Sequence, residues 1–322
     1  MKKQSRKLKD NIENLLPGVR KNVLLKRYTT FRVGGPAKYF FKAKTDQDLT
    51  KAVIVARKSR IPFFIIGHGS NVLFPDTGFR GLVVKVENDH YKIRENKIYA
   101  GAGMLMDTLV RTSINKGLRG LEWAGGLPGT LGGAVRGNAG AFGGETKDSI
   151  FEVEFLDNEN KIKKVNNKNC FFNYRSSIFK KRNFIILSAV IKLSKGNKKD
   201  LWKIARNHIQ YRKDYHPLTH PNAGSIFKNY DIKKASKEIK NLFTNVIKTD
   251  PFPIIPTALI ILKAGLSGKT IGRAQISKKH SNYIINLGGA TANDVKKLIK
   301  FAKNAIKNKF KINIETEIQI ID

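Results

Sequence analysis

Three stretches of the sequence contain side chains that could do acid chemistry on an anionic substrate. Ser225 lies within NAGSIFKN, Arg175 lies within FNYRSSIF, and Glu315 and Glu317 lie within the C-terminal KINIETEIQI. A hydroxyl, a guanidinium and a carboxyl group together offer a proton donor and two groups that can stabilise charge on a substrate carboxylate. Taken singly, each of these residue types is more often structural, so the elements that would position them decide the interpretation.

The C-terminal stretch alternates in the way that predicts a β-strand. In a strand, successive side chains point to opposite faces, so residues two apart share a face. Both glutamates therefore fall on one face, and the alternation by itself does not say which of them would meet a substrate. The apolar face holds Ile312, Ile314, Ile318 and Ile320, and the other face holds Glu315, Glu317 and Gln319.

Two glycine-rich segments are typical of loops that hold a phosphorylated ligand. The segment from Gly67 to Val84 begins with a turn after a buried strand, and such a turn can expose backbone N–H groups to an anion. The segment from Gly120 to Glu145 has ten glycines in 26 residues with apolar anchors between them. A plain hairpin connection and a flexible linker are the structural alternatives for the two segments. A third turn, at Gly101 and Gly103, lacks the last glycine of the dinucleotide fingerprint because Met106 stands there.

The remaining pattern predicts a mixed α and β protein. YTTFRVGGPAKYFFKA predicts two strands around a Gly-Gly-Pro turn, and a helix capped by Thr45 and a short buried strand (IPFFIIG) follow, as in α/β and α+β units. Further strands are expected in SIFEVEFLD, KIKKVNN and RNFIILSAVIKLS. Helices are expected in DLWKIARNHIQYR and from Val295 to Phe310, and a domain boundary near residues 196 to 212.

Composition places limits on the class of protein. With 322 residues and 41% hydrophobic content, the chain can bury more than one core. The formal charge of +36 is spread along the whole length, mostly as Lys, which favours a general compositional bias over a specific polyanion site. Cys170 is the only cysteine, and no apolar run is long enough for a leader or a membrane span. We therefore expect a cytoplasmic protein without disulfides, metal, membrane or specific nucleic-acid partner.

The ordered motifs resemble one enzyme family. YTTFRVGGPA, GHGSNVLF, GLEWAGGLPGTLGGAVRGNAGAFGGE, FNYRSSIF, NAGSIFKN and IETEI occur in the order and spacing of UDP-N-acetylenolpyruvoylglucosamine reductases, in their shorter form. These flavoenzymes, also called UDP-N-acetylmuramate dehydrogenases, complete UDP-N-acetylmuramate for peptidoglycan and cell wall synthesis. The six motifs extend over about 290 residues.

The resemblance implies an α+β fold with an FAD-binding domain of the vanillyl-alcohol oxidase (PCMH) type. We expect an N-terminal arm at residues 1–27 and an FAD-binding domain at 28–200 with lobes at 28–84 and 85–200. A substrate-binding α+β domain at 201–322 would follow. FAD would be bound non-covalently between the lobes, largely through backbone N–H groups.

The resemblance also assigns the binding residues. Arg212, Lys213, Tyr215 and Asn229 are candidates for the UDP moiety, since its phosphates need positive charge near the serine loop. One departure from common versions of the motif is Arg136-Gly137 before Asn138. The residues expected to bind FAD are Gly67, His68, Gly69, Ser70, Asn71, Val72, Gly125, Gly126, Pro128, Gly129, Gly132, Gly133, Asn138 and Gly140.

The catalytic roles carried over by the resemblance belong to Arg175, Ser225 and Glu317. NADPH would reduce FAD, and reduced FAD would give hydride to the enolpyruvyl group of the sugar nucleotide. Arg175 and protonated Glu317 would stabilise the charge on the substrate carboxylate, and Ser225 would protonate the adjacent carbon. The resemblance, and not the alternation, selects Glu317 over Glu315.

Two other classes remain open from the sequence. Related oxidases attach FAD covalently to a histidine in a Gly-Gly-His-Ser turn, and His68 lies in a similar Gly-His-Gly-Ser turn. Covalent attachment there would make the protein an alcohol or sugar oxidase. The charge of +36 leaves a nucleic-acid-binding protein as the second alternative, which would bind polyanions in a salt-dependent manner and lack flavin.

Overall fold

The computed structural model describes residues 12–249 and 252–322 and divides them into two units. Unit 1 comprises residues 12–23, 37–68 and 79–210, and unit 2 comprises residues 24–36, 69–78, 211–249 and 252–322. The predicted division into an arm, two FAD-binding lobes and a C-terminal domain from residue 201 stays a prediction. Most of the predicted arm, residues 1–11, lies outside the described residues.

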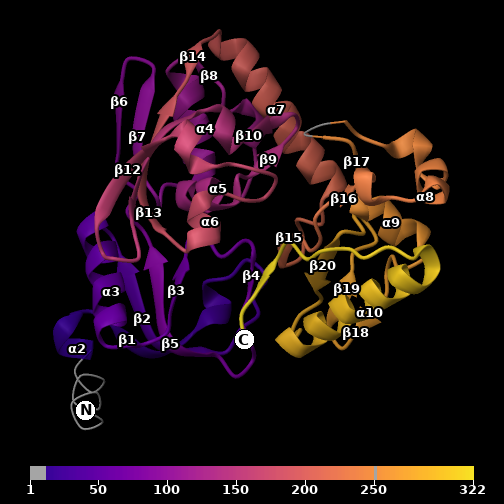
Figure 1. The fold of residues 1–322 in the computed structure, drawn as a ribbon, viewed down its shortest axis with the longest axis horizontal. Coiled ribbons are helices and arrows are strands. Elements are labelled where there is room, and N and C mark those ends of the chain that lie inside the picture. Colours follow the sequence, from indigo (N-terminus) through magenta and orange to yellow (C-terminus); the bar gives the residue numbers. More distant parts are fainter. Residues whose placement is uncertain (1–11, 250–251) are drawn as a thin grey trace. The chain divides into compact units, whose positions relative to one another are not determined.

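Unit 1 contains a four-stranded sheet whose central strands are parallel. Its order is β1-β2-β5-β3, formed by Arg20–Leu24, Pro36–Ala43, Phe79–Val86 and Phe63–Ile66. The helix predicted after Thr45 is α3 (Asp46–Lys58), and it begins with a capping box: Thr45 Oγ1 accepts a hydrogen bond from Asp48 N, and the Asp48 carboxylate accepts one from Thr45 N. This confirms the β, α, β order of β2, α3 and β3 (Figure 1). The further strand predicted before the Gly-Gly-Pro turn is wrong, because residues 28–33 form a turn and irregular chain.

A second, antiparallel sheet in unit 1 has the order β12-β11-β13-β7-β6. It contains the three predicted later strands as β11 (Ile150–Leu156), β12 (Ile162–Asn166) and β13 (Ile185–Lys192). One continuous apolar core, from Ile12 to Ala205, joins both sheets with α3 and with α4 (Met106–Asn115). The other elements of unit 1 are α2 Ile12–Leu15, β6 Tyr91–Arg94, β7 Lys97–Gly101, β8 Leu118–Arg119, η2 Glu122–Ala124, α5 Leu131–Gly137, β9 Gly140–Ala141, β10 Gly144–Glu145, η3 Thr146–Asp148, η4 Asn167–Cys170, α6 Ile178–Arg182 and β14 Ser194–Lys195.

Unit 2 has its own sheet and its own core. The sheet has the order β15-β20-β19-β18, from Asn222–Ser225, Tyr283–Asn286, Ala274–Ile276 and Thr270–Ile271. Helix α10 (Ala292–Phe310) packs its apolar side against β18 and β19 (Figure 1). The other elements are η1 Leu25–Arg27, β4 Val72–Leu73, β16 Tyr230–Asp231, η5 Ile232–Lys234, α8 Lys237–Leu242, η6 Thr244–Val246, β17 Ile254–Ile255, α9 Thr257–Lys263 and β21 Gln319–Ile320, and α7 (Lys198–Tyr215) contains the boundary between the units.

The predicted C-terminal strand is much shorter than the alternation indicated. Only Gln319–Ile320 forms a strand, β21, which pairs in parallel with β4. Upstream, Thr316 forms an isolated β-bridge with Phe227. The stretch therefore keeps its alternating side chains without forming a continuous ladder of strand hydrogen bonds. Ile312, Ile314 and Ile318 are nevertheless buried, as the alternation predicted. Burial of these isoleucines in the unit 2 core therefore determines which side chains of the C-terminal stretch point to the interior.

Candidate functional site

The two glycine-rich segments meet in unit 1 at Gly67 and Thr130. A Cβ added to Gly67 would lie 2.3 Å from Thr130 Oγ1, so only glycine fits at this position. Thr130 is also the N-cap of α5, because its Oγ1 accepts a hydrogen bond from Gly133 N at 3.4 Å. The structure thus brings together two segments that are more than 60 residues apart and that were both predicted to hold FAD.

The long glycine-rich segment is ordered and forms a short helix. Three backbone hydrogen bonds attach it to the preceding turn: Met106 N to Gly129 O, Leu131 N to Met104 O, and Gly132 N to Ala102 O. These bonds and α5 exclude the flexible-linker alternative.

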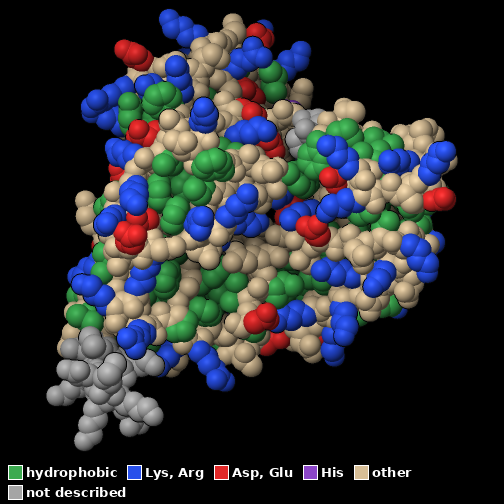
Figure 2. Space-filling view, viewed as in Figure 1, with side chains coloured by type: hydrophobic (Ala, Val, Ile, Leu, Met, Phe, Trp, Pro, Cys, Tyr) green, Lys and Arg blue, Asp and Glu red, His purple; other side chains and the backbone are tan. Residues whose placement is uncertain are grey.

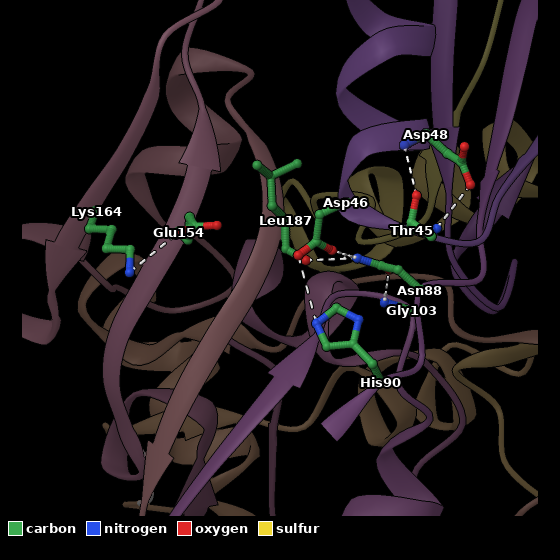
Figure 3. Close-up of polar contacts among 9 residues, drawn as sticks. All are labelled: Thr45, Asp46, Asp48, Asn88, His90, Gly103, Glu154, Lys164 and Leu187. Carbon is green, nitrogen blue, oxygen red and sulfur yellow. Dashed lines mark hydrogen bonds and ion pairs between the residues drawn. The ribbon is translucent and has the colours of Figure 1, made fainter. Parts of the chain in front are cut away.

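The turn at Gly101 and Gly103 has a structural role. Asn88, fully buried, accepts a hydrogen bond from Gly103 N at 2.7 Å and donates to Leu187 O at 2.9 Å and to the Asp46 carboxylate (Figure 3). A Cβ at Gly101 would lie 2.1 Å from Asn88 O. The space beside the turn at Gly101 and Gly103 is therefore filled by the protein's own backbone at Asn88.

Five of the ten glycines of the long segment pack so closely that an added Cβ would lie less than 3.0 Å from another atom of the protein. A Cβ at Gly125 would lie 2.7 Å from Ala205 O, and one at Gly132 would lie 2.9 Å from the Ala102 Cβ. At Gly133, by contrast, the nearest atom is 3.6 Å away, and at Gly137 nothing lies within 4 Å. Close chain packing thus accounts for part of the glycine content, whereas a Cβ at Gly133 or Gly137 would meet no close neighbour.

Arg175 lies at the tip of a tight turn, in the left-handed conformation with φ 51°. Asn173 and Ser176 exchange both backbone hydrogen bonds at 3.0 Å, which closes the turn. The Arg175 Nη2 donates to Gly140 O at 3.1 Å, and its guanidinium carbon lies 5.0 Å from the centre of the Tyr174 ring. The predicted catalytic arginine is therefore next to Gly140 of the predicted FAD site.

Two residues of the glycine-rich segment hold the arginine turn in place. Asn138, fully buried, donates to Asn173 O at 3.2 Å. Arg136 donates to Phe179 O at 2.7 Å, and its own carbonyl accepts a hydrogen bond from Ser177 Oγ at 2.7 Å. Arg136, which differs from common versions of the family motif, therefore connects α5 to α6.

Ser225 ends β15 in unit 2, directly opposite Tyr283 of β20. The preceding loop is held by Thr30, whose Oγ1 donates to Asn222 O at 2.7 Å and whose backbone N donates to Gly69 O at 3.1 Å. Gly69 belongs to the second half of the predicted FAD turn. Unit 2 therefore places the second half of that turn, residues 69–72, near the serine loop.

Glu317 lies beside the serine loop and Glu315 does not share its surroundings. The Glu317 backbone N donates to Ile226 O at 2.8 Å, and its carbonyl accepts from Asn71 Nδ2 at 3.3 Å. The Glu315 carboxylate instead forms ion pairs with Lys228 and Lys234, both at 3.0 Å. These two lysines lower the pKa of Glu315 and keep it ionised. The two glutamates therefore differ in position: Glu317 is joined to the serine loop through its backbone, and Glu315 is paired with lysines.

An aromatic cluster behind Ser225 was missed by the sequence interpretation. The Tyr283 hydroxyl lies 3.1 Å from His216 Nδ1, and the His280 ring packs edge-on against Tyr283 at 4.8 Å. Burial raises the pKa of Tyr283 to about 12, so the phenol is neutral. Arg212, also buried, has its pKa lowered by burial and interacts electrostatically with Tyr283. Only the strand pairing of Ser225 with Tyr283 reveals this cluster.

The other predicted UDP-binding residues have varied positions in unit 2. Tyr215 is 55% exposed, and its ring centre lies 4.6 Å from that of Tyr211. The Lys213 carbonyl accepts a hydrogen bond from Lys279 Nζ at 2.6 Å. Asn229 Oδ1 accepts from Thr257 N at 3.3 Å, at the start of α9. Their role toward a ligand stays a prediction.

A cavity of about 780 Å³ in unit 2 lies apart from these residues. It is lined by Arg32, His220, Asn286 and the Gly288-Gly289 turn, among others, and contains none of the predicted site residues. Asp76 in its wall accepts hydrogen bonds from Ala292 N and Asn293 N and so caps α10. This wall carboxylate is satisfied by the helix.

Comparison with known proteins decides the family. Residues 37–166 match a family model described as an FAD binding domain. Residues 216–321 match the UDP-N-acetylenolpyruvoylglucosamine reductase C-terminal domain. A UDP-N-acetylenolpyruvoylglucosamine reductase of Caldanaerobacter subterraneus subsp. tengcongensis is 38% identical over 93% of this chain and 92% of the relative. The chain belongs to the UDP-N-acetylenolpyruvoylglucosamine reductase family.

Two further comparisons cover nearly the whole chain. The reductase of Clostridium novyi is 34% identical over 99% of this chain and 97% of the relative. The crystal structure of the reductase from Thermus caldophilus has a TM-score of 0.74 and 29% identity, covering 93% of this chain and 98% of that one. The predicted fold class, an α+β protein with an FAD-binding domain and a reductase C-terminal domain, is confirmed.

The family matches cover the predicted residues unevenly. The FAD-binding match includes every predicted cofactor residue from Gly67 to Gly140, and the C-terminal match includes Ser225 and Glu317. Arg175 lies between the two matches, so its assignment depends on the FNYRSSIF motif and on its contact with Gly140. Among residues 12–249 and 252–322, no helix is long and apolar enough to cross a membrane. In the same residues no cluster of His, Cys, Asp and Glu forms a metal site.

Proposed function

We propose that this protein reduces the enolpyruvyl ether of UDP-N-acetylenolpyruvoylglucosamine to UDP-N-acetylmuramate with NADPH, in the cytoplasm, as a step of peptidoglycan precursor synthesis. The observation that supports this best is the pairing of the serine loop with the Glu317 backbone, next to Asn71 of the predicted FAD turn. The family membership supports the same substrate, because relatives covering nearly the whole chain carry that name.

The glycine-rich segments fit a non-covalently bound FAD. The turn from Gly67 to Val72 and the segment from Gly125 to Gly140 offer backbone N–H groups, which suit a diphosphate. When bound, FAD would carry hydride from NADPH to the enolpyruvyl group. Binding of the substrate carboxylate and donation of the proton are proposed for side chains of the protein.

Arg175 and Glu317 are proposed to bind the substrate carboxylate. Hydride addition places negative charge on that carboxylate, and a guanidinium can meet it with two parallel hydrogen bonds. A protonated Glu317 can donate a third hydrogen bond. Glu315 does not suit this role, since two lysines hold it ionised.

Ser225 is proposed to give its hydroxyl proton to the carbon next to the carboxylate. A hydroxyl is a weak acid, but the carbanion-like centre is strongly basic, so the transfer is feasible. Arg212, Lys213, Tyr215 and Asn229 are proposed to bind the UDP moiety. Of these, buried Arg212 has the strongest structural support, because it lies beside the Tyr283 cluster behind the serine.

The test is an absorbance spectrum of the purified protein followed by titration with NADPH. We expect flavin bands that bleach on titration, and all yellow colour in the supernatant after acid precipitation. Colour retained in the pellet would favour the oxidase alternative with FAD attached to His68. Absence of flavin, together with failure of added FAD to bind, would contradict the proposal and leave the nucleic-acid alternative.

A further inference from the structure

Lys85 donates a hydrogen bond into the turn where the predicted FAD site begins. It lies on β5 beside Ile66, the last residue of β3, in the parallel register of these two strands. Its Nζ lies 2.6 Å from Gly67 O. Gly67 is also the residue that contacts Thr130 of the second glycine-rich segment. The ammonium group is therefore at the junction of the two segments.

The Lys85 ammonium is partly withdrawn from water and has no acidic partner. Among the described residues it forms no ion pair, and the nearby Glu87 carboxylate is paired with Lys42 at 3.1 Å. Burial lowers the pKa of Lys85; Glu87 opposes this shift and Lys42 adds to it. The pKa of the adjacent His68 is lowered by burial and then by Lys85 itself. His68 supplies no negative charge, and the negative charge of Glu87, which favours a half-buried ammonium at Lys85, is shared with Lys42.

We propose that the Lys85 ammonium belongs to the cofactor site and complements the negative charge of the FAD diphosphate at the Gly67 turn. The inference rests on the proposed function, because it takes FAD as the ligand of that turn. A neutral hydrogen-bond donor would suffice to hold the Gly67 carbonyl. A cation at this position instead indicates an anionic ligand.

Substitutions at Lys85 separate its charge from its hydrogen bond. Lys85→Gln keeps an amide donor for Gly67 O and removes the charge, whereas Lys85→Met removes both. Lys42→Gln is the matched control, because Lys42 is the strand partner of Lys85 in β2 and its charge is already paired with Glu87.

The measurement is the dissociation constant of the apoproteins for FAD and for riboflavin, which lacks phosphate, by fluorescence titration. We expect Lys85→Gln and Lys85→Met to bind FAD roughly 10- to 100-fold more weakly, the range for a hydrogen bond to a charged group, with riboflavin binding unchanged. FAD affinity should also depend less on salt in both variants. Lys42→Gln should bind FAD like the wild type.

Three results would overturn the inference. FAD binding unchanged in Lys85→Gln would show that the charge is not used. A parallel loss of FAD and riboflavin affinity would show that Lys85 acts only on the shape of the turn. A melting temperature of the Lys85→Gln apoprotein well below that of the wild-type apoprotein would also indicate a structural role. A wild-type protein that binds no FAD would instead contradict the proposed function itself.

Discussion

Glu315 and Glu317 are two residues apart in the chain but lie in different hydrogen-bonding surroundings. Glu315 is held between Lys228 and Lys234, and Glu317 is linked through its backbone to Ile226 and Asn71. Ser225 is next to Ile226 in the chain and is thus one residue from the partner of Glu317. The proposed chemistry at this scale depends on which of the two carboxyl groups lies beside the serine loop.

The first prediction separates the two half-reactions through Ser225. Ser225→Ala should still allow NADPH to bleach the flavin at near the wild-type rate, because that hydride transfer needs no proton from the serine. Turnover of the enolpyruvyl substrate should fall by roughly 10² to 10⁴, as expected for a lost general acid. Stopped-flow absorbance in the flavin band measures both steps. A variant reoxidised by substrate as fast as the wild type would remove Ser225 from the mechanism.

The second prediction compares the two glutamates. Glu317→Gln should reduce turnover of the enolpyruvyl substrate roughly 10²-fold or more, since it removes the carboxyl group assigned to the transition state. Glu315→Gln should have only a mild effect, because it breaks ion pairs of a side chain that is exposed to solvent. Steady-state rates of both variants test this. The reverse order of effects would show that the motif assignment is displaced by two residues.

At the scale of elements, the segment from α5 to α6 works as a support for Arg175. Helix α5 begins at the Thr130 cap and ends at Asn138, whose left-handed φ of 43° turns the chain toward β9. Asn138 and Arg136 then bind the backbone on both sides of the arginine turn. Arg175, the arginine proposed to bind the substrate carboxylate, is therefore positioned by the same helix that follows the glycine-rich loop.

The third prediction concerns this support. Arg136→Ala removes the hydrogen bonds to Phe179 O and Asn183 Oδ1, so the turn should hold Arg175 less firmly. We expect the KM for the enolpyruvyl substrate to rise and turnover to fall several-fold, while NADPH reduces the flavin at near the wild-type rate. Arg182→Ala, on the exposed end of α6, is the matched control and should change neither step. Equal kinetics in the two variants would contradict the supporting role.

At the scale of the whole molecule, charge is distributed rather than concentrated. Figure 2 shows Lys and Arg side chains scattered over the visible face, with Asp and Glu fewer and interspersed.

His216 of unit 2 is a titratable group that affects the stability of the fold, because it is half-buried beside cations. Burial lowers its pKa to about 4, and His280, Arg212 and Lys279 add to the shift. His216 is therefore protonated at a lower pH in the folded protein than in the unfolded chain.

The fourth prediction is a loss of stability in mild acid that depends on His216. Its pKa is about 4 when folded and 6.5 ordinarily, so between these values the unfolded state binds more protons. The free energy of unfolding should therefore fall as the pH falls from 6.5 to 4. His216→Gln should flatten this dependence in part, since the pKa of His280 is also lowered. Denaturant midpoints across this range test it, with exposed His220→Gln as the control that keeps the wild-type slope.

The sequence by itself determined the order of elements and the family. The capped helix after Thr45, the buried strand after it, the later strands and the long C-terminal helix follow from periodicity and cap residues, which act over a few positions. The glycine-rich segments were also visible, because only glycine permits such close chain approach. Local patterns therefore suffice wherever neighbours in the chain decide the structure.

Only the tertiary structure decided which distant residues meet. The contact of Gly67 with Thr130, the support of Arg175 by Arg136, the pairing of Ser225 with Tyr283 and the position of Lys85 all join residues far apart in the chain. The C-terminal alternation likewise predicted burial correctly but not the length of the strand. Glu315 and Glu317 are equivalent in the alternation, and the ion pairs of Glu315 with Lys228 and Lys234 form only on folding, because electrostatic interactions depend on distance in space and not along the chain.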